Sequence, residues 1–189
     1  MKRDLHTERL ILRQWKDEDR PHFFSLNNDS EVMRYFPRYF TLKESNSYIN
    51  DNAKAIEETG WGSWAVEIKN TGDFIGFVGL SRPAPWHPCA GSVEIGWRLA
   101  RQFWGKGYAT EAAHRAMEHG FITIGFQEIV SFTAVCNQPS IRVMKKLGMA
   151  KDPTGFDHPR IALESDLRPH VVYRLTKQQW LSKQAANAE

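Results

Sequence analysis

Residues 102–112, QFWGKGYATEA, place two glycines two positions apart between a strand pattern and a helix pattern. Ahead of this junction the chain alternates with period 2 over 92–99, where one face carries Val93, Ile95, Trp97 and Leu99 and the other carries Ser92, Glu94, Gly96 and Arg98. Behind it, apolar residues recur at helical spacing to about Ile124. A glycine in the first turn of a helix lowers helix propensity, so this junction needs a compensating role.

Anion binding is one such role. The first N–H groups of a helix have no partner inside the helix, and the helix dipole adds partial positive charge there. Because residues 105 and 107 lack a Cβ atom, the turn can wrap these N–H groups around a phosphate. Arg101 and Lys106 add positive charge nearby. The segment therefore predicts an anion site, although a tight strand-to-helix connection without a ligand would also use glycines.

Two familiar nucleotide motifs do not fit this junction. A Rossmann fingerprint needs a third glycine where Thr110 stands, and an acidic residue at the end of the next strand, whereas Glu128 begins one. A Walker A motif needs a glycine in place of Ala100 and a serine or threonine in place of Gly107. Nucleotide hydrolysis and dinucleotide binding are therefore poor interpretations.

The remaining elements alternate between strands and helices. We expect strands at 8–15, 61–68, 73–82, 128–135 and 170–175, and helices that start after Asp17, after Thr41 and after Asn137. Thr41 and Glu44 have the spacing of a capping box, and Gly148 stands where a helix C′ glycine belongs. The pattern has no linker or repeat and predicts one α/β (α+β) domain over residues 1–189.

Composition excludes several classes of protein. The formal net charge of +3 lacks the dense basic face of a nucleic-acid binder. No run of 18 apolar residues and no secretory signal occur, and two cysteines do not make a disulfide scaffold, so we expect a cytoplasmic protein without membrane partners. His114 and His119 lack zinc-helix spacing, Glu111 and His114 lack a second matching pair, and we expect no metal.

A third phosphate motif does match. The run from Gln102 through Gly105 to Gly107 resembles the Q/R-x-x-G-x-G/A signature of the GNAT N-acetyltransferases. The wider run EIGWRLARQFWGKGYATEA is similar to the RimJ/RimL branch, whose best-known members acetylate protein N-termini. Four further blocks resemble the family in the same order: TERLILRQWKDEDRPHFFSLNND, GDFIGFVGL, NQPSIRVMKKLGM and HVVYRL. The resemblance thus covers nearly the whole chain.

The resemblance implies a fold and a cofactor site. The fold would be a mixed central sheet of six to seven strands flanked by helices, with one strand splayed from its parallel neighbour. Acetyl-CoA would be the co-substrate, its pantetheine arm pairing with the backbone of Trp97, Arg98 and Leu99, and Asn137 would lie near the thioester. The N–H groups that would hold the pyrophosphate belong to Trp104, Gly105, Lys106, Gly107, Tyr108, Ala109 and Thr110.

Acetyl transfer needs a neutral amine, a polarised carbonyl and a protonated leaving thiolate. Glu94, on the strand beside the cofactor, is the first candidate for the base, because desolvation there would raise its pKa. It could equally be a solvent-facing carboxylate, while Glu111 is expected to be solvated. His87 and His158 lie in loops that could border the acceptor.

The acid is less obvious. Many GNAT relatives carry a tyrosine seven residues after the asparagine, where this chain has Met144, which cannot donate a proton. Ser140, which RimJ/RimL-like proteins also have three residues after the asparagine, could hydrogen-bond the coenzyme sulfur or bond its own backbone. Aromatic residues in 31–40 and 83–91, and the segment 155–166, could form walls of an acceptor pocket.

The sequence therefore predicts an acetyl-CoA-dependent N-acetyltransferase acting on a primary amine, as a monomer or homodimer, with Glu94 and Ser140 as catalytic residues. A catalytically silent acetyl-CoA-binding sensor module is the alternative, favoured by the missing tyrosine. The acceptor stays open among protein N-termini, polyamines, antibiotics and other small amines.

Overall fold

The computed structural model describes residues 4–186, which leaves only the ends of the expected 1–189 domain outside the described residues. Within 4–186, nine strands join one mixed sheet in the order β1-β2-β3-β4-β5-β6-β9-β7, with β8 pairing beside β9. The strands are β1 (Leu5–His6), β2 (Leu10–Arg13), β3 (Ser63–Ile68), β4 (Phe74–Ser81), β5 (Glu94–Leu99), β6 (Glu128–Ala134), β7 (Ala150–Lys151), β8 (Phe156–Asp157) and β9 (Pro169–Thr176).

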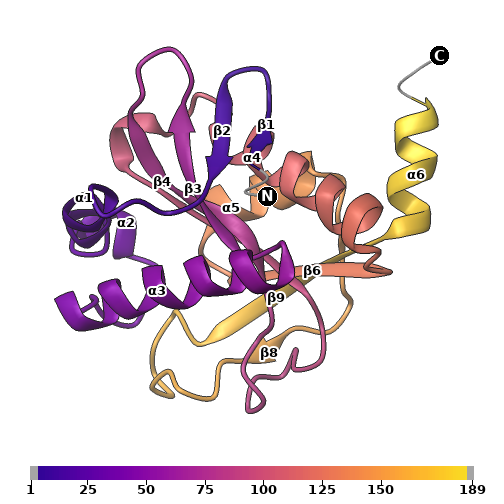
Figure 1. The fold of residues 1–189 in the computed structure, drawn as a ribbon. Helices are drawn as coiled ribbons and strands as arrows, with labels where there is room; N and C mark the ends of the chain where they lie inside the picture. The colour runs from indigo at the N-terminus through magenta and orange to yellow at the C-terminus, as the bar shows by residue number, and fades with distance from the viewer. Residues whose placement is uncertain (1–3, 187–189) are drawn as a thin grey trace.

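Helices flank the sheet on both faces (Figure 1). They are α1 (Asp19–Leu26), α2 (Ser30–Met33), α3 (Leu42–Thr59), α4 (Tyr108–Glu118), α5 (Gln138–Lys146) and α6 (Lys177–Ala186). A 3₁₀ turn, η1 (Arg101–Phe103), precedes α4, and a π-helical turn, η2 (His119–Ile124), continues it. The expected fold class is confirmed.

The sheet has more strands than the six to seven expected. The additional strands, β1, β7 and β8, have two residues each, and they exist through pairing with β2 or β9 rather than through an apolar pattern of their own. Such short pairings leave no period-2 signal in a sequence. The six longer strands all coincide with segments expected to be strands, with β9 one residue longer at each end than the expected 170–175.

Helix ends follow the sequence signals in most places. Thr41 and Glu44 form the capping box of α3, and the side chain of Asn137 caps α5 by accepting from the N–H of Ser140. Gly148 follows the C-cap of α5 with φ +74°. The expected N-cap at Asp17 is wrong: Glu18 is the N-cap of α1, with no side-chain cap bond.

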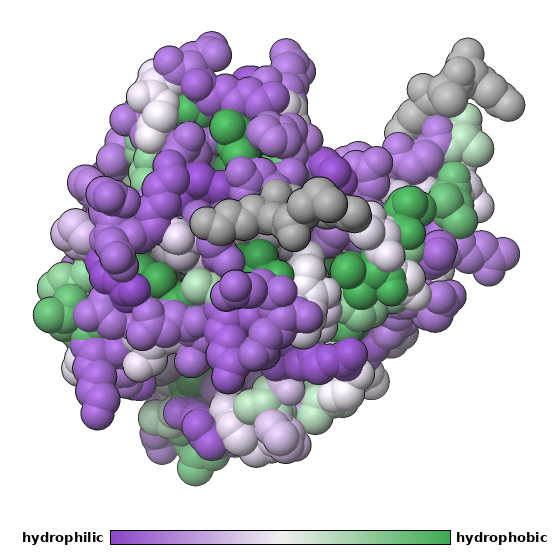
Figure 2. All heavy atoms as spheres, viewed as in Figure 1, coloured by the Kyte–Doolittle hydropathy of each residue, from purple (hydrophilic) through white to green (hydrophobic). Residues whose placement is uncertain are grey.

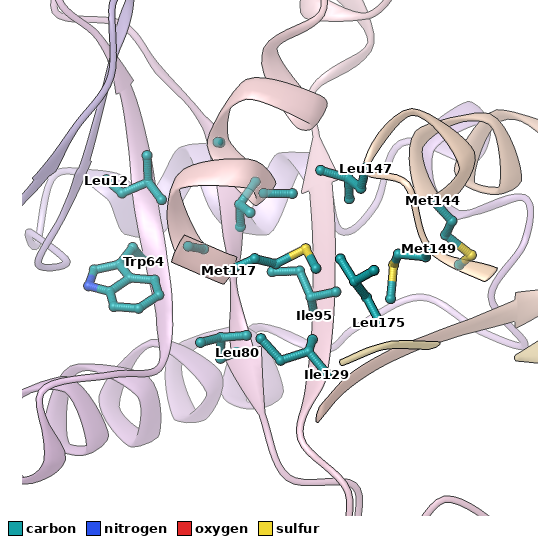
Figure 3. Close-up of a cluster of buried hydrophobic side chains, with 14 of the residues drawn as sticks. Leu12, Trp64, Leu80, Ile95, Met117, Ile129, Met144, Leu147, Met149 and Leu175 are labelled. Carbon is teal, nitrogen blue, oxygen red and sulfur yellow. The ribbon is translucent and has the colours of Figure 1, made fainter. Parts of the chain in front are cut away.

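The larger core lies between the sheet and helices α4 and α5 (Figure 3). Its members alternate along the strands, so that Trp64 and Val66 of β3 face this core while Ala65 faces the other side. Buried side chains labelled in Figure 3 include Leu12, Trp64, Leu80, Ile95, Met117, Ile129, Met144, Leu147, Met149 and Leu175. Each fully buried large apolar side chain contributes about 1.5–3 kcal/mol of transfer free energy.

A second core lies on the opposite face, under α1, α2 and α3. It contains Trp15, Phe23, Leu26, Val32, Ile49, Ala65 and Phe77. Val93, just before β5, and Ile95 and Leu99 within it belong to the larger core, so Glu94, Gly96 and Arg98 lie on the side of α1–α3. The facing predicted from the sequence for these strand residues is thus confirmed, and it decides which groups reach the site.

The surface drawn in Figure 2 is mainly hydrophilic, and its apolar residues form small separate groups rather than one continuous patch. None of the helices within residues 4–186 combines the length and the apolar character that crossing a membrane requires.

Candidate functional site

The parallel strands β5 and β6 separate soon after they meet. Within residues 4–186 they pair at one position, Glu94 opposite Val130, next to a bond from the N–H of Val130 to the carbonyl of Val93 (2.8 Å). On its other side, β5 pairs with β4 along its whole length. Backbone groups of a strand point to alternate sides, so the N–H and C=O groups of Ile95 and Trp97 point toward the unpaired side. The splayed strands that the resemblance implies are therefore present.

The backbone groups of Arg98 and Leu99, which were also predicted to pair with the cofactor, are already engaged elsewhere. By the same alternation, the backbone of Arg98 faces β4, where this residue pairs with Phe77. The carbonyl of Leu99 accepts a hydrogen bond from Nε1 of Trp104 (2.7 Å). Pairing of a pantetheine arm with this edge stays a prediction, for which Trp97 is better oriented than Arg98.

The glycine turn joins β5 to α4. Gly105 and Gly107 have φ angles of +75° and +83°, left-handed conformations that glycine adopts without strain. The first bond of α4 runs from the N–H of Glu111 to the carbonyl of Gly107 (3.0 Å), so the N–H groups of residues 108–110 lie outside the helical ladder. A Cβ atom on Gly105 would meet nothing within 4 Å, so open space adjoins the turn at this residue. The turn therefore fits an anion such as a pyrophosphate.

The guanidinium of Arg9 holds this turn in place. It donates to the carbonyl of Lys106 (3.0 Å), pairs with Glu111 (2.5 Å) and lies 4.7 Å from the ring centre of Tyr108. Glu111 also accepts from Thr7 Oγ1 (2.6 Å), and these bonds lower the pKa of its carboxyl against the effect of burial. Glu111 is thus an ionised anchor of the turn rather than a solvated residue.

One cavity of about 760 Å³ connects the strand gap, the glycine turn and the face under α2 and α3. Twelve of the predicted site residues line it: Glu94, Trp97, Arg98, Leu99, Trp104, Gly105, Gly107, Tyr108, Ala109, Thr110, Asn137 and Ser140. Gln102 and Lys106 do not line it; both are exposed, and the Lys106 ammonium lies 5.5 Å from the ring centre of Phe103.

Glu94 lies at the point where β5 and β6 begin to separate. Burial raises the pKa of its carboxyl to about 7, and the hydrogen bond from Ser81 Oγ (3.3 Å) opposes part of this rise. Within residues 4–186, no lysine, arginine or histidine forms an ion pair with this carboxylate. Near neutral pH it can therefore both accept and release a proton.

Asn137 and Ser140 form a small network at the start of α5. The amide Nδ2 of Asn137 donates to Thr133 Oγ1 (2.8 Å) and to Ser140 Oγ (3.2 Å), while its Oδ1 caps the helix. The Ser140 hydroxyl accepts one bond and donates none to any group within residues 4–186, so its proton is available to a ligand in the cavity.

The acceptor side is built from α2, the loop after it, α3 and part of 155–166. Tyr35, Phe36 and Tyr48 line the cavity there, together with His158 and Ile161. No residue of the loop 83–91 lines it. His87 is buried, its ring stacked on Phe132 (4.3 Å between centres), and burial lowers the pKa of its imidazole to about 4.

The sequence reasoning missed four basic side chains at this cavity: Arg34, Arg98, Arg142 and Lys146. Arg142 and Lys146 belong to α5, and their exposed side chains add positive charge near the predicted phosphate turn. The position of Arg98 beside Glu94 on one strand face was a usable signal. Within residues 4–186, no three His, Cys, Asp or Glu side chains are grouped to hold a metal ion.

Comparisons with known proteins agree on one family. The model described as "Acetyltransferase (GNAT) domain" matches residues 9–150. YkkB of Bacillus subtilis is 34% identical over 149 residues, covering 78% of this chain and 86% of YkkB. The FsC-acetyl coenzyme A-N(2)-transacetylase of Aspergillus fumigatus is 31% identical over 193 residues, covering 95% and 79%. A crystal structure of a GNAT-family acetyltransferase from Bacillus anthracis superposes with a TM-score of 0.76 at 25% identity, covering 93% and 99%.

Proposed function

Because this chain belongs to the GNAT acetyltransferase family, we propose that it transfers an acetyl group to a primary amine bound in the cavity beside β5. The chain is an N-acetyltransferase, and acetyl-CoA is its co-substrate. One observation carries the assignment of the site: the gap between β5 and β6, the glycine turn and a carboxyl of raised pKa all open into the same cavity.

The residues present fit acetyl-CoA. The free backbone groups of Trp97 would pair with the amides of the pantetheine arm, and the N–H groups at the start of α4 would bind the pyrophosphate. Arg142 and Lys146 supply charge on the same side of the cavity. Bound acetyl-CoA supplies the acetyl group: the amine nitrogen bonds to the thioester carbon as the carbon–sulfur bond breaks.

Glu94 acts as the general base in this proposal. An amine enters largely as its ammonium ion, which cannot attack a carbonyl until it loses a proton. A carboxylate whose pKa is about 7 can take that proton at neutral pH, directly or through one water. Ser140 places a free hydroxyl proton in the cavity, and we assign it to the leaving sulfur, since Met144 is buried and has no proton to give.

The acceptor is a protein N-terminus or a small amine in this proposal. Similarity of residues 94–112 to the RimJ/RimL branch supports an assignment to that branch. Cys89 and Cys136 are both free thiols, which supports a reducing, cytoplasmic location. A monomeric or homodimeric state stays a prediction.

The test is amine-dependent release of the coenzyme A thiol from acetyl-CoA by the purified chain. Peptides with free N-termini, polyamines and small amines would be supplied in turn, and mass spectrometry would identify the acetylated nitrogen. We expect turnover with at least one primary amine. Tight binding of acetyl-CoA without turnover on any amine would instead favour the silent sensor module.

A further inference from the structure

Arg98 is a buried cation that has no carboxylate partner among the described residues. Its side chain projects from β5 toward α1–α3, and the residue is 8% exposed. Within residues 4–186, no carboxylate lies within 4.0 Å of its guanidinium. Burial of a charge without a counter-charge costs free energy, and a protein retains such a group where something else offsets that cost.

The contacts of Arg98 offset only part of the free energy that burial of its charge costs. Its Nη1 donates to Oδ1 of Asn27, whose own amide donates to Ser45 Oγ (2.8 Å). The guanidinium carbon also lies 4.0, 5.1 and 5.7 Å from the ring centres of Phe36, Phe40 and Phe77, within the range of cation–π contacts. Of the five N–H donors that an arginine carries, a single one has a partner among these residues, and Nε is buried without one.

This guanidinium lines the same cavity as Glu94. The two side chains share one face of β5, with only Gly96 between them, and glycine leaves the floor of the cavity open. A Cβ atom on Gly96 would come no nearer than 3.8 Å to any other atom, that atom being Oε1 of Glu94. An extended molecule can therefore lie along the strand from the carboxyl of Glu94 to Arg98.

Most of the charged side chains that line the cavity are basic. Glu94 is the only acidic side chain among the described lining residues, whereas Arg34, Arg98, Arg142 and Lys146 are basic. A polyamine carries a second ammonium group, which needs acidic partners away from the reacting nitrogen. A carboxylate on the acceptor would instead accept charge-assisted hydrogen bonds from the N–H groups of Arg98 that have no partner among the described residues.

We propose that the acceptor is an amine that also carries a carboxylate, with the amine at Glu94 and the carboxylate on the guanidinium of Arg98. This inference rests on the proposed acetyltransferase function and names the substrate class of the same site. Arg98 is in this account a binding and specificity residue. A purely structural role, in which it only ties α1 and the Phe36 loop to the sheet, is the competing explanation.

The experiment compares three straight-chain series of matched length. They are ω-amino acids from glycine to ε-aminocaproate, their carboxamides, and the corresponding diamines, each assayed by coenzyme A release. We expect the best ω-amino acid to exceed its carboxamide and diamine in kcat/KM by about 10-fold or more, the effect of one charge-assisted pair. Turnover in which the carboxamides or diamines equal the amino acids would overturn the inference and leave the acetyltransferase function standing. No turnover on any amine, including free peptide N-termini, would overturn both.

A substitution at Arg98 distinguishes a role in substrate binding from a purely structural role. Arg98→Gln should reduce the preference for carboxylate over carboxamide to about one, with kcat/KM for the carboxylate falling further than kcat/KM for the carboxamide, because one side of the charge pair is gone. An equal loss for both substrates would show a structural role and contradict the assignment. Arg38→Gln is the matched control, since Arg38 is exposed, pairs with Glu44 (2.6 Å) and does not line the cavity. If Arg98→Gln fails to fold, the three wild-type series decide the question alone.

Discussion

The side-chain amide of Asn137 donates a hydrogen bond to the hydroxyl oxygen of Ser140 over 3.2 Å, while its carbonyl oxygen caps helix α5. Helix capping is therefore done by Asn137 and not by Ser140. A change at Ser140 can remove the hydroxyl without removing the cap.

Ser140→Ala tests the role of this hydroxyl. We expect kcat to fall roughly 10-fold with little change in the KM for acetyl-CoA, because a hydrogen bond to a developing thiolate is made mainly in the transition state. Steady-state kinetics and the thermal midpoint would be measured together. A wild-type kcat in a normally folded variant would limit Ser140 to a structural part of the α5 network.

Gly105→Ala tests the phosphate turn. Its φ of +75° will cost about 1–2 kcal/mol of stability in any residue with a Cβ, and the new methyl group would stand in the open space before the turn. We expect the KM for acetyl-CoA to rise several-fold. Gly72→Ala is the matched control, because Gly72 has φ +74° and nothing within 4 Å of its Cβ position, but does not line the cavity. Equal KM values for both variants would contradict a phosphate role for the turn.

Asp19→Asn tests the bond between α1 and the sheet. Arg13 of β2 donates to both carboxylate oxygens of Asp19, at 2.7 and 2.8 Å, and both residues are buried. Arg13 keeps Glu67 as a second partner (2.6 Å), so weakening its bonds to Asp19 should cost about 1–3 kcal/mol and lower Tm by roughly 5 °C. The exposed pair of Arg20 and Asp17 (2.8 Å) is the control, and Asp17→Asn should change stability by no more than about 0.5 kcal/mol. Similar losses in the two variants would contradict this account.

Stability should also depend on the ionisation of Glu94. Its pKa is about 7 when folded against 4.5 ordinarily, so between these values the folded state binds the extra proton. The free energy of unfolding should therefore fall as pH rises through this range, by up to about 3 kcal/mol. Denaturant unfolding of wild type and Glu94→Gln at about pH 5 and pH 8 checks this, and the variant should lose less stability than wild type. Parallel pH dependence in the two proteins would show that Glu94 is not the group responsible.

Much of the architecture followed from local sequence signals. The alternation over 92–99 placed Glu94 and Arg98 on one face, and the caps of α3 and α5 were readable because Thr41 and Asn137 act within three residues of themselves. The predictions that failed did so because contacts between residues distant from the predicted signal determined the structure. Asp17 does not cap α1 because Asp19 binds Arg13 and the N–H of Lys16 and so fixes the start of that helix.

In the candidate site, too, local sequence signals predicted some features, whereas others depend on residues far away along the chain. Most predicted residues meet at one cavity because the glycine turn and β5 are neighbours in sequence. The environment of Arg98 could not be predicted, since it depends on Asn27 and Phe36, which are about 60–70 positions away along the chain. Likewise, Glu111 is an anchor of the turn because Thr7 and Arg9 reach it from the connection between β1 and β2, about 100 positions away along the chain.

The pH dependence of kcat/KM, measured for wild type and Glu94→Gln with the best amine acceptor, tests the central claim most directly. Wild type should rise with pH through an apparent pKa near 7, well below the pKa of the amine itself, because Glu94 must be ionised to accept a proton. Glu94→Gln should lose this limb and about 100-fold or more of the rate, while the exposed Glu58→Gln should keep both. A Glu94→Gln variant that keeps the wild-type rate and the limb near pH 7 would contradict the account.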